Sequence, residues 1–234
     1  MIAQSKSGLG YHSCMSTVSL ILLAGGSGSR MGGGIPKQFR LLQGKPLILY
    51  SFEFFSSLPE VNELVVVCES SYRDFFKKES GLRFALPGKR RQDSVYNGLR
   101  AASEEADLIC VHDGARPFVD RLAFLACLRK AEKEGAAALA VPASNTIKRV
   151  DGDRVVQTLP RQDLWEMQTP QVIQRKLFSE AYEYANSREI EATDDLSLVE
   201  AFGHPVYLIK SSPENFKVTT PFDWSVAESL CASR

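Results

Sequence analysis

The segment Leu20 to Phe39, LILLAGGSGSRMGGGIPKQF, places two cationic side chains within and just after a glycine-rich stretch. From Gly25 onward side chains are nearly absent, so backbone N–H groups can approach an anion closely. Arg30 and Lys37 add positive charge to the same stretch. A flexible surface turn is the alternative interpretation, but a buried strand that leads directly into glycines and a Pro-Lys pair favours phosphate binding. The segment therefore predicts a site for a nucleoside triphosphate.

Two better-known phosphate-binding patterns do not match this segment. The P-loop requires G-x-x-x-x-G-K-[ST], which the glycine stretch does not contain. The dinucleotide fingerprint G-x-G-x-x-G requires a third glycine at the position that Met31 occupies. The nucleotide site is therefore expected to be of another kind.

The composition excludes several classes of protein. The 28 Lys and Arg residues balance 28 Asp and Glu residues, which argues against broad binding to nucleic acid or to anionic membranes. The five cysteines are scattered and form no C-x-x-C pair, which indicates reduced thiols and no zinc site or disulfide framework. No apolar run approaches the ~20 residues of a membrane helix, and residues 1–14 lack the apolar core of a secretory signal. We expect an unstructured leader over residues 1–16, a single domain over 17–234 and a cytoplasmic protein.

Apolar runs typical of strands alternate along the chain with segments of helical spacing. Because the strands are continuously apolar, this pattern predicts an α/β fold with a doubly wound, mainly parallel sheet covered on both faces. Ligands of such sheets bind at the carboxyl ends of the strands, where the glycine stretch, the Pro87-Gly88 loop and Asp113 fall. Strands are expected at 17–24, 63–68, 83–86, 108–112, 136–141 and 205–210, and helices at 46–58, 71–79, 93–102, 121–134, 175–185, 194–202 and from 221 onward.

The pattern changes between residues 144 and 170. Two alternating strands, 146–150 and 155–159, flank the turn DGDR, and Asp-Gly is a strong hairpin signal. An isolated hairpin is marginally stable in water, so we expect it to protrude as an arm that packs on a second subunit of a homodimer. Asp151-Gly152-Asp153 also matches a D-x-D metal motif, but its position in a turn favours turn chemistry.

Several short motifs follow one another along the chain. In sequence order they are LAGGSGSRM, PKQF, RRQDSV, VHDGARPF, NTIKR, TPQ, TDD and NFKVTTPFDW. This ordered set resembles the 2-C-methyl-D-erythritol 4-phosphate cytidylyltransferases of the non-mevalonate isoprenoid pathway, from about Thr17 to the C-terminus. The resemblance implies a nucleotide-diphospho-sugar transferase-like, Rossmann-like sandwich with a dimerisation arm. It also implies Mg²⁺-dependent transfer of CMP from CTP to 2-C-methyl-D-erythritol 4-phosphate, with release of pyrophosphate.

The resemblance assigns roles to individual residues. Arg30 and Lys37 would contact the triphosphate, and Asp113 would hold Mg²⁺, a hard ion that prefers oxygen ligands. The implied contacts with CTP also involve Ala24, Gly25, Gly26, Gly28, Gly88 and Ser94. The polyol phosphate would be bound by Arg116, Thr146, Arg161, Thr169, Thr193 and Lys217, with Arg161 and Lys217 counted among the catalytic residues.

Several of these residues have purely structural alternatives. Asp113 could cap a turn, Ser94 could cap a helix, and Thr193 could cap the helix that follows it. Arg161 could form a surface ion pair. We assign His112 to structure, because a histidine that ends a buried strand is more often a satisfied core residue than a catalyst.

Other functions also stay open. Lys89 and Arg90 stand where many relatives carry acidic or small residues, which leaves the contacts to cytosine undefined. A D-ribitol 5-phosphate cytidylyltransferase is the nearest alternative, because it shares the glycine stretch, PKQF and a KVTTP segment. A glycosyltransferase would need its D-x-D beside the sheet edge, and a non-catalytic nucleotide-binding protein would be expected to lack Lys37 or Asp113.

Overall fold

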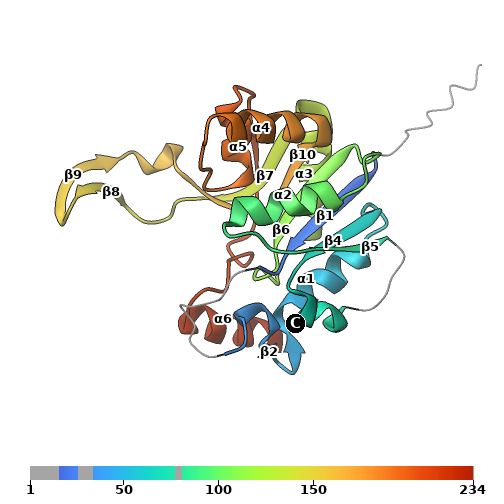
Figure 1. Cartoon of the computed structure of the whole chain (residues 1–234). Helices are drawn as coiled ribbons and strands as arrows, with labels where there is room; N and C mark the ends of the chain where they lie inside the picture. Colours follow the sequence, from blue (N-terminus) through green and yellow to red (C-terminus); the bar gives the residue numbers. More distant parts are fainter. Residues whose placement is uncertain (1–15, 26–33, 77–80, 234) are drawn as a thin grey trace, which may run out of the picture.

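A seven-stranded sheet forms the centre of the computed structural model, which describes residues 16–25, 34–76 and 81–233 (Figure 1). The strand order is β11-β7-β10-β6-β1-β4-β5. All neighbouring strands run parallel except β10, which is antiparallel to both β6 and β7. The strands are β1 (Val18–Leu23), β4 (Glu63–Val67), β5 (Leu82–Ala85), β6 (Leu108–Asp113), β7 (Ala136–Pro142), β10 (Trp165–Gln174) and β11 (Tyr207–Lys210). The doubly wound, mainly parallel sheet predicted from the sequence is confirmed.

Helices cover both faces of this sheet, as continuously buried strands require. On one face the core contains side chains of α1 (Leu47–Ser56) and α3 (Arg121–Glu134). On the other face it contains side chains of α2 (Arg91–Ala101), α4 (Arg175–Ser187) and α5 (Asp195–Ala201). The strands β1, β4, β6 and β7 consist mostly of apolar residues, and all six residues of β1 are buried. Burial on both sides keeps the carboxyl ends of the strands in fixed positions.

A third, smaller core lies beyond the carboxyl ends of the strands. It joins α6 (Pro221–Ala232) to the short ribbon of β2 (Leu41–Leu42) and β3 (Lys45–Pro46). The 3₁₀ turn η2 (Lys37–Phe39) precedes this ribbon. These pieces lie at the lower end of the molecule in Figure 1. Of these pieces, η2 contributes Lys37 and Gln38 to the wall of the site described below.

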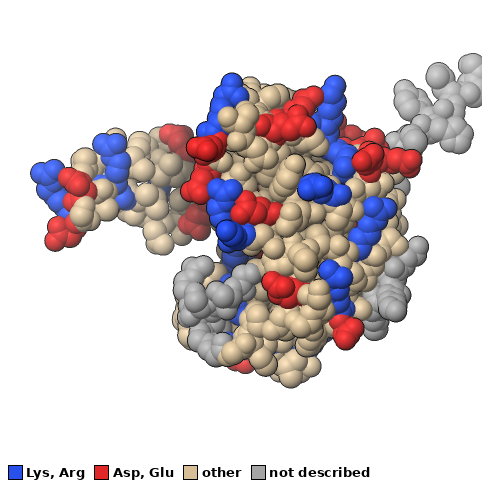
Figure 2. Space-filling model, in the orientation of Figure 1, with Lys and Arg blue, Asp and Glu red and all other residues tan. Residues whose placement is uncertain are grey.

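The predicted hairpin is a projecting arm of β8 (Ile147–Asp151) and β9 (Arg154–Leu159). It extends from the body between β7 and β10 and carries both acidic and basic side chains (Figures 1 and 2). Val150, Val155 and Val156 are exposed on it by 54%, 55% and 47%. The arm's base is closed by a hydrogen bond from Ala143 N to Leu164 O of 2.9 Å and by the 3₁₀ turn η4 (Arg161–Asp163).

Four local predictions differ from the structure. The helix expected at 71–79 is the 3₁₀ turn η3 (Ser70–Phe75), with residues 77–79 outside the described part. The segment after the arm, expected only to return the chain, is the ten-residue strand β10, whose Thr169-Pro170 peptide is cis. The helix α2 starts two residues early, because Asp93 caps it from the third helical position. Asp194, and not Thr193, caps α5 by accepting from Ser197 N.

Two further observations concern the class of protein. In the described ranges no helix is long and apolar enough to cross a membrane. The described cysteines are free thiols, and burial raises the pKa of Cys68 to about 11. The expected leader lies almost entirely outside the described residues.

Candidate active site

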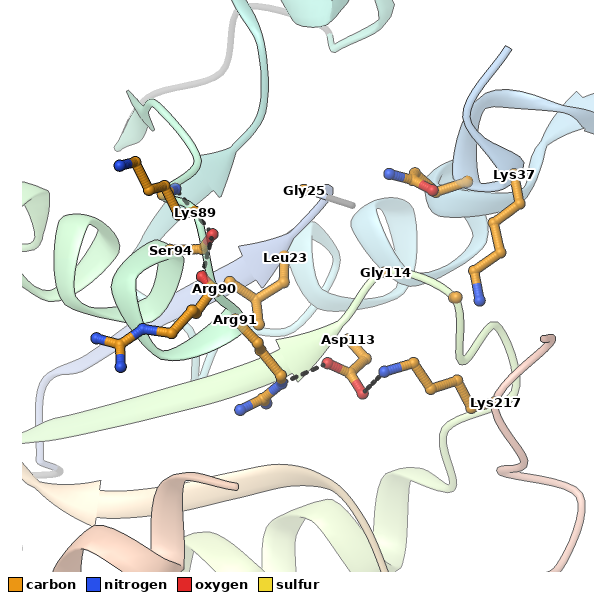
Figure 3. Close-up of a pocket in the computed structure, with 13 residues that line it drawn as sticks. Leu23, Gly25, Lys37, Lys89, Arg90, Arg91, Ser94, Asp113, Gly114 and Lys217 are labelled. Carbon is orange, nitrogen blue, oxygen red and sulfur yellow. Dashed lines mark hydrogen bonds and ion pairs between the residues drawn. The ribbon is translucent and has the colours of Figure 1, made fainter. Parts of the chain in front are cut away.

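Two adjoining hollows lie at the carboxyl ends of the central strands. The first, of about 190 Å³, is lined by the end of β1, the 3₁₀ turn η2, the start of α2 and the end of β6 (Figure 3). The second, of about 290 Å³, is lined by β10, the segment before α5 and the loop before α6. Arg91, Asp113 and Lys217 line both hollows. These three residues therefore form the boundary between the hollows.

Asp113 is the last residue of β6, and its carboxylate lies between cations. Lys217 Nζ is 2.8 Å from Oδ2, and Arg91 Nε is 3.2 Å from Oδ1 (Figure 3). Arg116 Nε lies 3.8 Å from Oδ2. Burial alone would raise the pKa of this carboxyl, but the three cations together hold the pKa of Asp113 well below its usual range. Asp113 is therefore a buried carboxylate that stays ionised at neutral pH.

Arg91 reaches Asp113 from the first turn of α2. Its two terminal nitrogens bind Asp195 at 3.1 and 2.8 Å. The Asp195 side chain is 1% exposed, and burial raises the pKa of this carboxyl although Arg91 acts in the opposite direction. Sequence reasoning missed both residues, although the motifs RRQDSV and TDD contain them. Their positions are far apart in the chain, so spacing within either motif gives no signal of the contact.

Two lysines meet at the loop before α6. Lys217 sits on this loop, and Lys37 Nζ donates to the neighbouring carbonyl of Val218 at 2.6 Å. Val218 N in turn donates to Ala115 O, which ties the loop to the end of β6. Lys37 comes from η2 and lies on the same side of the first hollow as Lys217, across from Lys89 and Arg90, as Figure 3 shows. The two lysines thus approach the same space from segments that are far apart in the sequence.

The loop before α2 forms the remaining wall of the first hollow. Ser94 Oγ accepts from Gly88 N at 2.9 Å and donates to Arg90 O at 3.1 Å. A Cβ at Gly88 would collide with Asp93, so the close packing of this loop requires glycine. Ser94 lies inside α2, and the alternative that it caps the helix is wrong. On the opposite wall, Gln38 Nε2 donates to Ala24 O where the glycine stretch begins.

A hydrogen-bonded chain through the buried His112 supports the wall of the second hollow. Asp113 N donates to Thr169 Oγ1, which leaves the threonine proton for His112 Nδ1 at 3.0 Å. His112 Nε2 then donates to Arg116 O at 3.1 Å. Burial lowers the pKa of His112 to about 3, so the ring is neutral. His112 is a satisfied core residue, as expected from the sequence, and it fixes the positions of Thr169 and Arg116.

Arg116 and Thr193 complete the second hollow. Arg116 donates to Asn215 O and Met167 O, while its buried Nε has no hydrogen-bond partner in the described structure. Thr193 lies before α5, beside Asp194, whose carboxylate accepts from Gln171 Nε2. This hollow therefore combines guanidinium, ammonium and hydroxyl groups, which suit a phosphate and a polyol.

Most of the predicted site residues that the structure describes lie at these hollows. The first is lined by Gly25, Lys37, Gly88, Ser94, Asp113 and Lys217, and the second by Arg116, Thr169 and Thr193 together with Asp113 and Lys217. Ala24 is buried next to Gly25. Gly26, Gly28 and Arg30 lie outside the described residues.

Thr146 and Arg161 are not brought to the hollows. Thr146 is exposed at the start of the arm, and Arg161 donates to Ser144 O at 2.8 Å on the arm's base. Among the described residues that line either hollow, neither of them occurs. Asp151 and Asp153, the acidic pair of the D-x-D sequence, lie at the arm's turn and are exposed. That position disfavours the glycosyltransferase alternative, whose D-x-D would lie beside the sheet edge.

The described residues contain no group of three or more His, Cys, Asp or Glu side chains that could hold a metal by themselves. Asp113 fits the other way in which Mg²⁺ is commonly bound, through one carboxylate together with substrate phosphates. Its carboxylate is ionised and lies between the two hollows. The residues present are therefore compatible with a metal that arrives with a nucleotide.

A doubly wound sheet with a glycine stretch after its first strand and cations around an ionised aspartate is suited to binding a nucleotide at the carboxyl ends of the strands. The sequence model of the family described as "IspD: 2-C-methyl-D-erythritol 4-phosphate cytidylyltransferase" matches residues 18–233. The chain belongs to this family.

Individual relatives agree with this assignment. The chain is 47% identical to the chloroplastic 2-C-methyl-D-erythritol 4-phosphate cytidylyltransferase of Oryza sativa subsp. japonica over 92% of this chain and 74% of that protein. It is 41% identical to the enzyme of that name from Chlamydia pneumoniae, over 91% of this chain and 98% of that protein. The crystal structure of the Thermus thermophilus enzyme of that name superposes with a TM-score of 0.76 at 33% identity, covering 93% of this chain and 100% of the other.

Proposed function

We propose that the chain transfers CMP from CTP to 2-C-methyl-D-erythritol 4-phosphate. The observation that carries the proposal is the pair of hollows that share Arg91, Asp113 and Lys217. One is bounded by the start of the glycine stretch and by Lys37, and the other is lined by an arginine and threonines. The names of the relatives supply the two substrates that fit these two environments.

The reaction is attack of a substrate phosphate oxygen on the α-phosphorus of CTP, with pyrophosphate as the leaving group. A phosphate monoester is already largely dianionic at neutral pH, so the attack needs no general base. Charge repulsion is the main obstacle, because like charges ~4 Å apart repel by about 4 kcal/mol at an effective dielectric constant of 20. Lys37, Lys217, Arg91 and Arg116 are arranged to offset that repulsion, and we assign Arg30 to the same task.

We assign Asp113 as the residue that would hold Mg²⁺. A bound Mg²⁺ would neutralise developing charge on the phosphate oxygens. The protein's own contribution is the orientation of the Asp113 carboxylate, which Lys217 and Arg91 hold from two sides. Thr193 and Thr169 would hold hydroxyl oxygens of the polyol, and Arg116 its phosphate.

We further propose a homodimer in which the arm of each subunit completes the second hollow of the other. The resemblance places Thr146 and Arg161 among the residues that bind the polyol phosphate, yet both are exposed at the base of the arm. Its exposed valines suit burial against a partner, since an isolated two-stranded hairpin is marginally stable. A twofold axis would place one arm at each of two equivalent sites.

The test of the proposed function is a direct comparison of substrates. The protein is incubated with CTP and Mg²⁺ and either 2-C-methyl-D-erythritol 4-phosphate or D-ribitol 5-phosphate, and pyrophosphate release is measured. We expect kcat/KM to be at least about a hundredfold higher for the branched substrate, because ribitol phosphate combines steric overlap with unpaired hydroxyls. Equal or higher kcat/KM for ribitol phosphate would assign the alternative function within the same enzyme class.

A further inference from the structure

The first turn of α2 is fastened to the segment 190–195 by three consecutive residues. Arg91 binds Asp195 through two nitrogens. Gln92 accepts from Ala192 N at 3.0 Å and donates to Ile190 O at 3.3 Å. At the surface, Arg90 binds Glu191 at 2.8 Å. The turn lines the first hollow and the segment carries Thr193 into the second, so these contacts join the two hollows.

Arg91 divides its donors between two carboxylates. Its terminal nitrogens face Asp195, while Nε alone faces Asp113. A guanidinium is a rigid planar fork, so fixing the two terminal nitrogens also fixes the direction of Nε. Asp195 is itself held, because its N–H and that of Leu196 donate to Gln171 Oε1. The direction from which Arg91 approaches Asp113 is therefore set by Asp195.

This arrangement leaves acceptor positions on Asp113. An ionised carboxylate has about four lone-pair positions. Arg91 Nε and Lys217 Nζ each take one, on different oxygens, and Arg116 Nε at 3.8 Å is too distant for a hydrogen bond. Each Asp113 oxygen therefore keeps a lone pair that none of these three cations uses. These lone pairs lie at the boundary of the two hollows.

We propose that Asp195 is a positioning residue for the transfer reaction, which limits Arg91 to a single contact with Asp113 and so keeps the Asp113 carboxylate open to a divalent cation. Without the charge of Asp195, the half-buried Arg91 would keep Asp113 as its one ion-pair partner among the described residues. Its fork would then turn to the two-nitrogen grip that arginine prefers with a carboxylate. That grip would cover the oxygens of Asp113. The inference rests on the proposed role of Asp113.

The test measures cation-dependent nucleotide binding, without turnover. CTP is titrated calorimetrically into the protein with and without Mg²⁺, in the absence of any polyol phosphate. For Asp195→Asn we expect CTP affinity in Mg²⁺ to fall by about tenfold or more, the usual effect of removing a partner that orients a metal ligand. CTP affinity without Mg²⁺ should stay within about twofold of the original protein. A loss of equal size under both conditions would overturn the proposal.

Two further variants separate positioning from folding. Glu191→Gln breaks the exposed ion pair between the same two segments and should change neither titration by more than about twofold, as for an exposed pair. The double variant Asp195→Asn, Arg91→Gln removes both charges of the buried pair, so Asp113 is uncovered. The measured quantity is the gain in CTP affinity that Mg²⁺ produces, because the direct loss of the Arg91 charge weakens CTP binding with and without Mg²⁺ alike. This gain should return to within about threefold of the original, since no fork then covers the carboxylate. If Mg²⁺ improves CTP binding of the double variant as little as it does in Asp195→Asn, the proposal is wrong.

The double variant also keeps the test available if Asp195→Asn alone does not fold, because it leaves no unpaired charge of this pair. Thermal unfolding of each variant establishes that binding is measured on folded protein. If the original protein binds CTP with Mg²⁺ but transfers nothing to either polyol phosphate, the proposed function fails while this binding test stands. The two failures are therefore distinguishable.

Discussion

The body and the arm of the molecule are stabilised in opposite ways. In the body, Lys37, Asp113 and Lys217 come from distant segments and are held at the ends of buried strands by hydrogen bonds and ion pairs. At the base of the arm, Thr146 and Arg161 are exposed, and the hairpin that they flank carries three valines that are about half exposed. The body therefore preorganises its part of the site within one chain, whereas the arm is proposed to act on a second subunit.

This difference predicts which substitutions act alone and which depend on a partner. A substitution in the preorganised body should impair the chemistry of its own subunit. A substitution on the arm should impair the neighbouring subunit. The predictions below test this division, from the largest expected effect to the smallest.

The largest effect is expected for Asp113→Asn. A neutral amide binds Mg²⁺ poorly, so activity should fall by about 10³-fold or more. Rates are measured across a range of Mg²⁺ concentrations, and circular dichroism checks that the fold is retained. Full activity at limiting Mg²⁺ would remove Asp113 from the role of metal ligand.

Lys37→Ala should lower kcat by roughly 10²–10³-fold, which corresponds to ~3–4 kcal/mol of transition-state stabilisation. The sequence predicts a similar loss for Arg30→Ala. Both changes should affect kcat far more than CTP binding, because these cations are proposed to meet charge that develops during transfer. Steady-state kinetics supplies the check: a raised KM for CTP with a nearly normal kcat would indicate uniform binding instead.

Mixing two inactive proteins, Lys37→Ala and Arg161→Ala, tests the arm directly. If Arg161 serves the partner's site, a mixed dimer has one site with both defects and one site with none. With random exchange of equal amounts, half the dimers are mixed, so about a quarter of the original activity should return. Each variant alone, after the same exchange treatment, is the control. A monomer in analytical ultracentrifugation would overturn the dimer proposal.

The smallest effect concerns the packing around His112. Its pKa is lowered to about 3, so the unfolded chain binds a proton between pH 6.5 and pH 3 that the folded chain does not. Stability should therefore fall as the pH falls through this window, by about 2 kcal/mol between pH 7 and pH 5. Denaturant unfolding of the protein and of His112→Gln at both pH values measures the difference. An equal pH dependence of both proteins would show that His112 is not held neutral.

The sequence predicted the sheet because its signals are local. The strands β1, β4, β6 and β7 each contain a continuous apolar run, and the hairpin carries Asp-Gly at its turn. The strand β10 was missed because its sequence, WEMQTPQVIQ, mixes polar residues and a proline into the run. Those polar side chains are used in the site, where Thr169 and Gln171 hold Asp113, His112 and α5. A strand adapted to a site thus loses the pattern that would predict it.

The sequence predicted only those site residues that belong to a recognised motif and have a role in the family that the motifs resemble. Gly88, Lys37 and Lys217 followed from short motifs and the resemblance they carry. The pairing of Arg91 with Asp195 depends on how α2 and α5 are placed by the fold, and no local pattern encodes it. Helix α2 was also expected to begin later, because Asp93 looks like a first capping residue but acts from the third helical position.

The arm is inserted between two neighbouring strands of the central sheet, so the sheet can form without it. The arm follows β7 and precedes β10 in the chain, and these two strands are antiparallel neighbours in the sheet. At its base Ala143 N donates to Leu164 O at 2.9 Å, so the two chain ends already meet as in a tight hairpin. Because a short loop costs little entropy to close, a brief turn could replace residues 145–163 without cutting the ladder. The fold of the body therefore does not depend on the length of the arm, and the arm can be shortened while the sheet keeps its strand order.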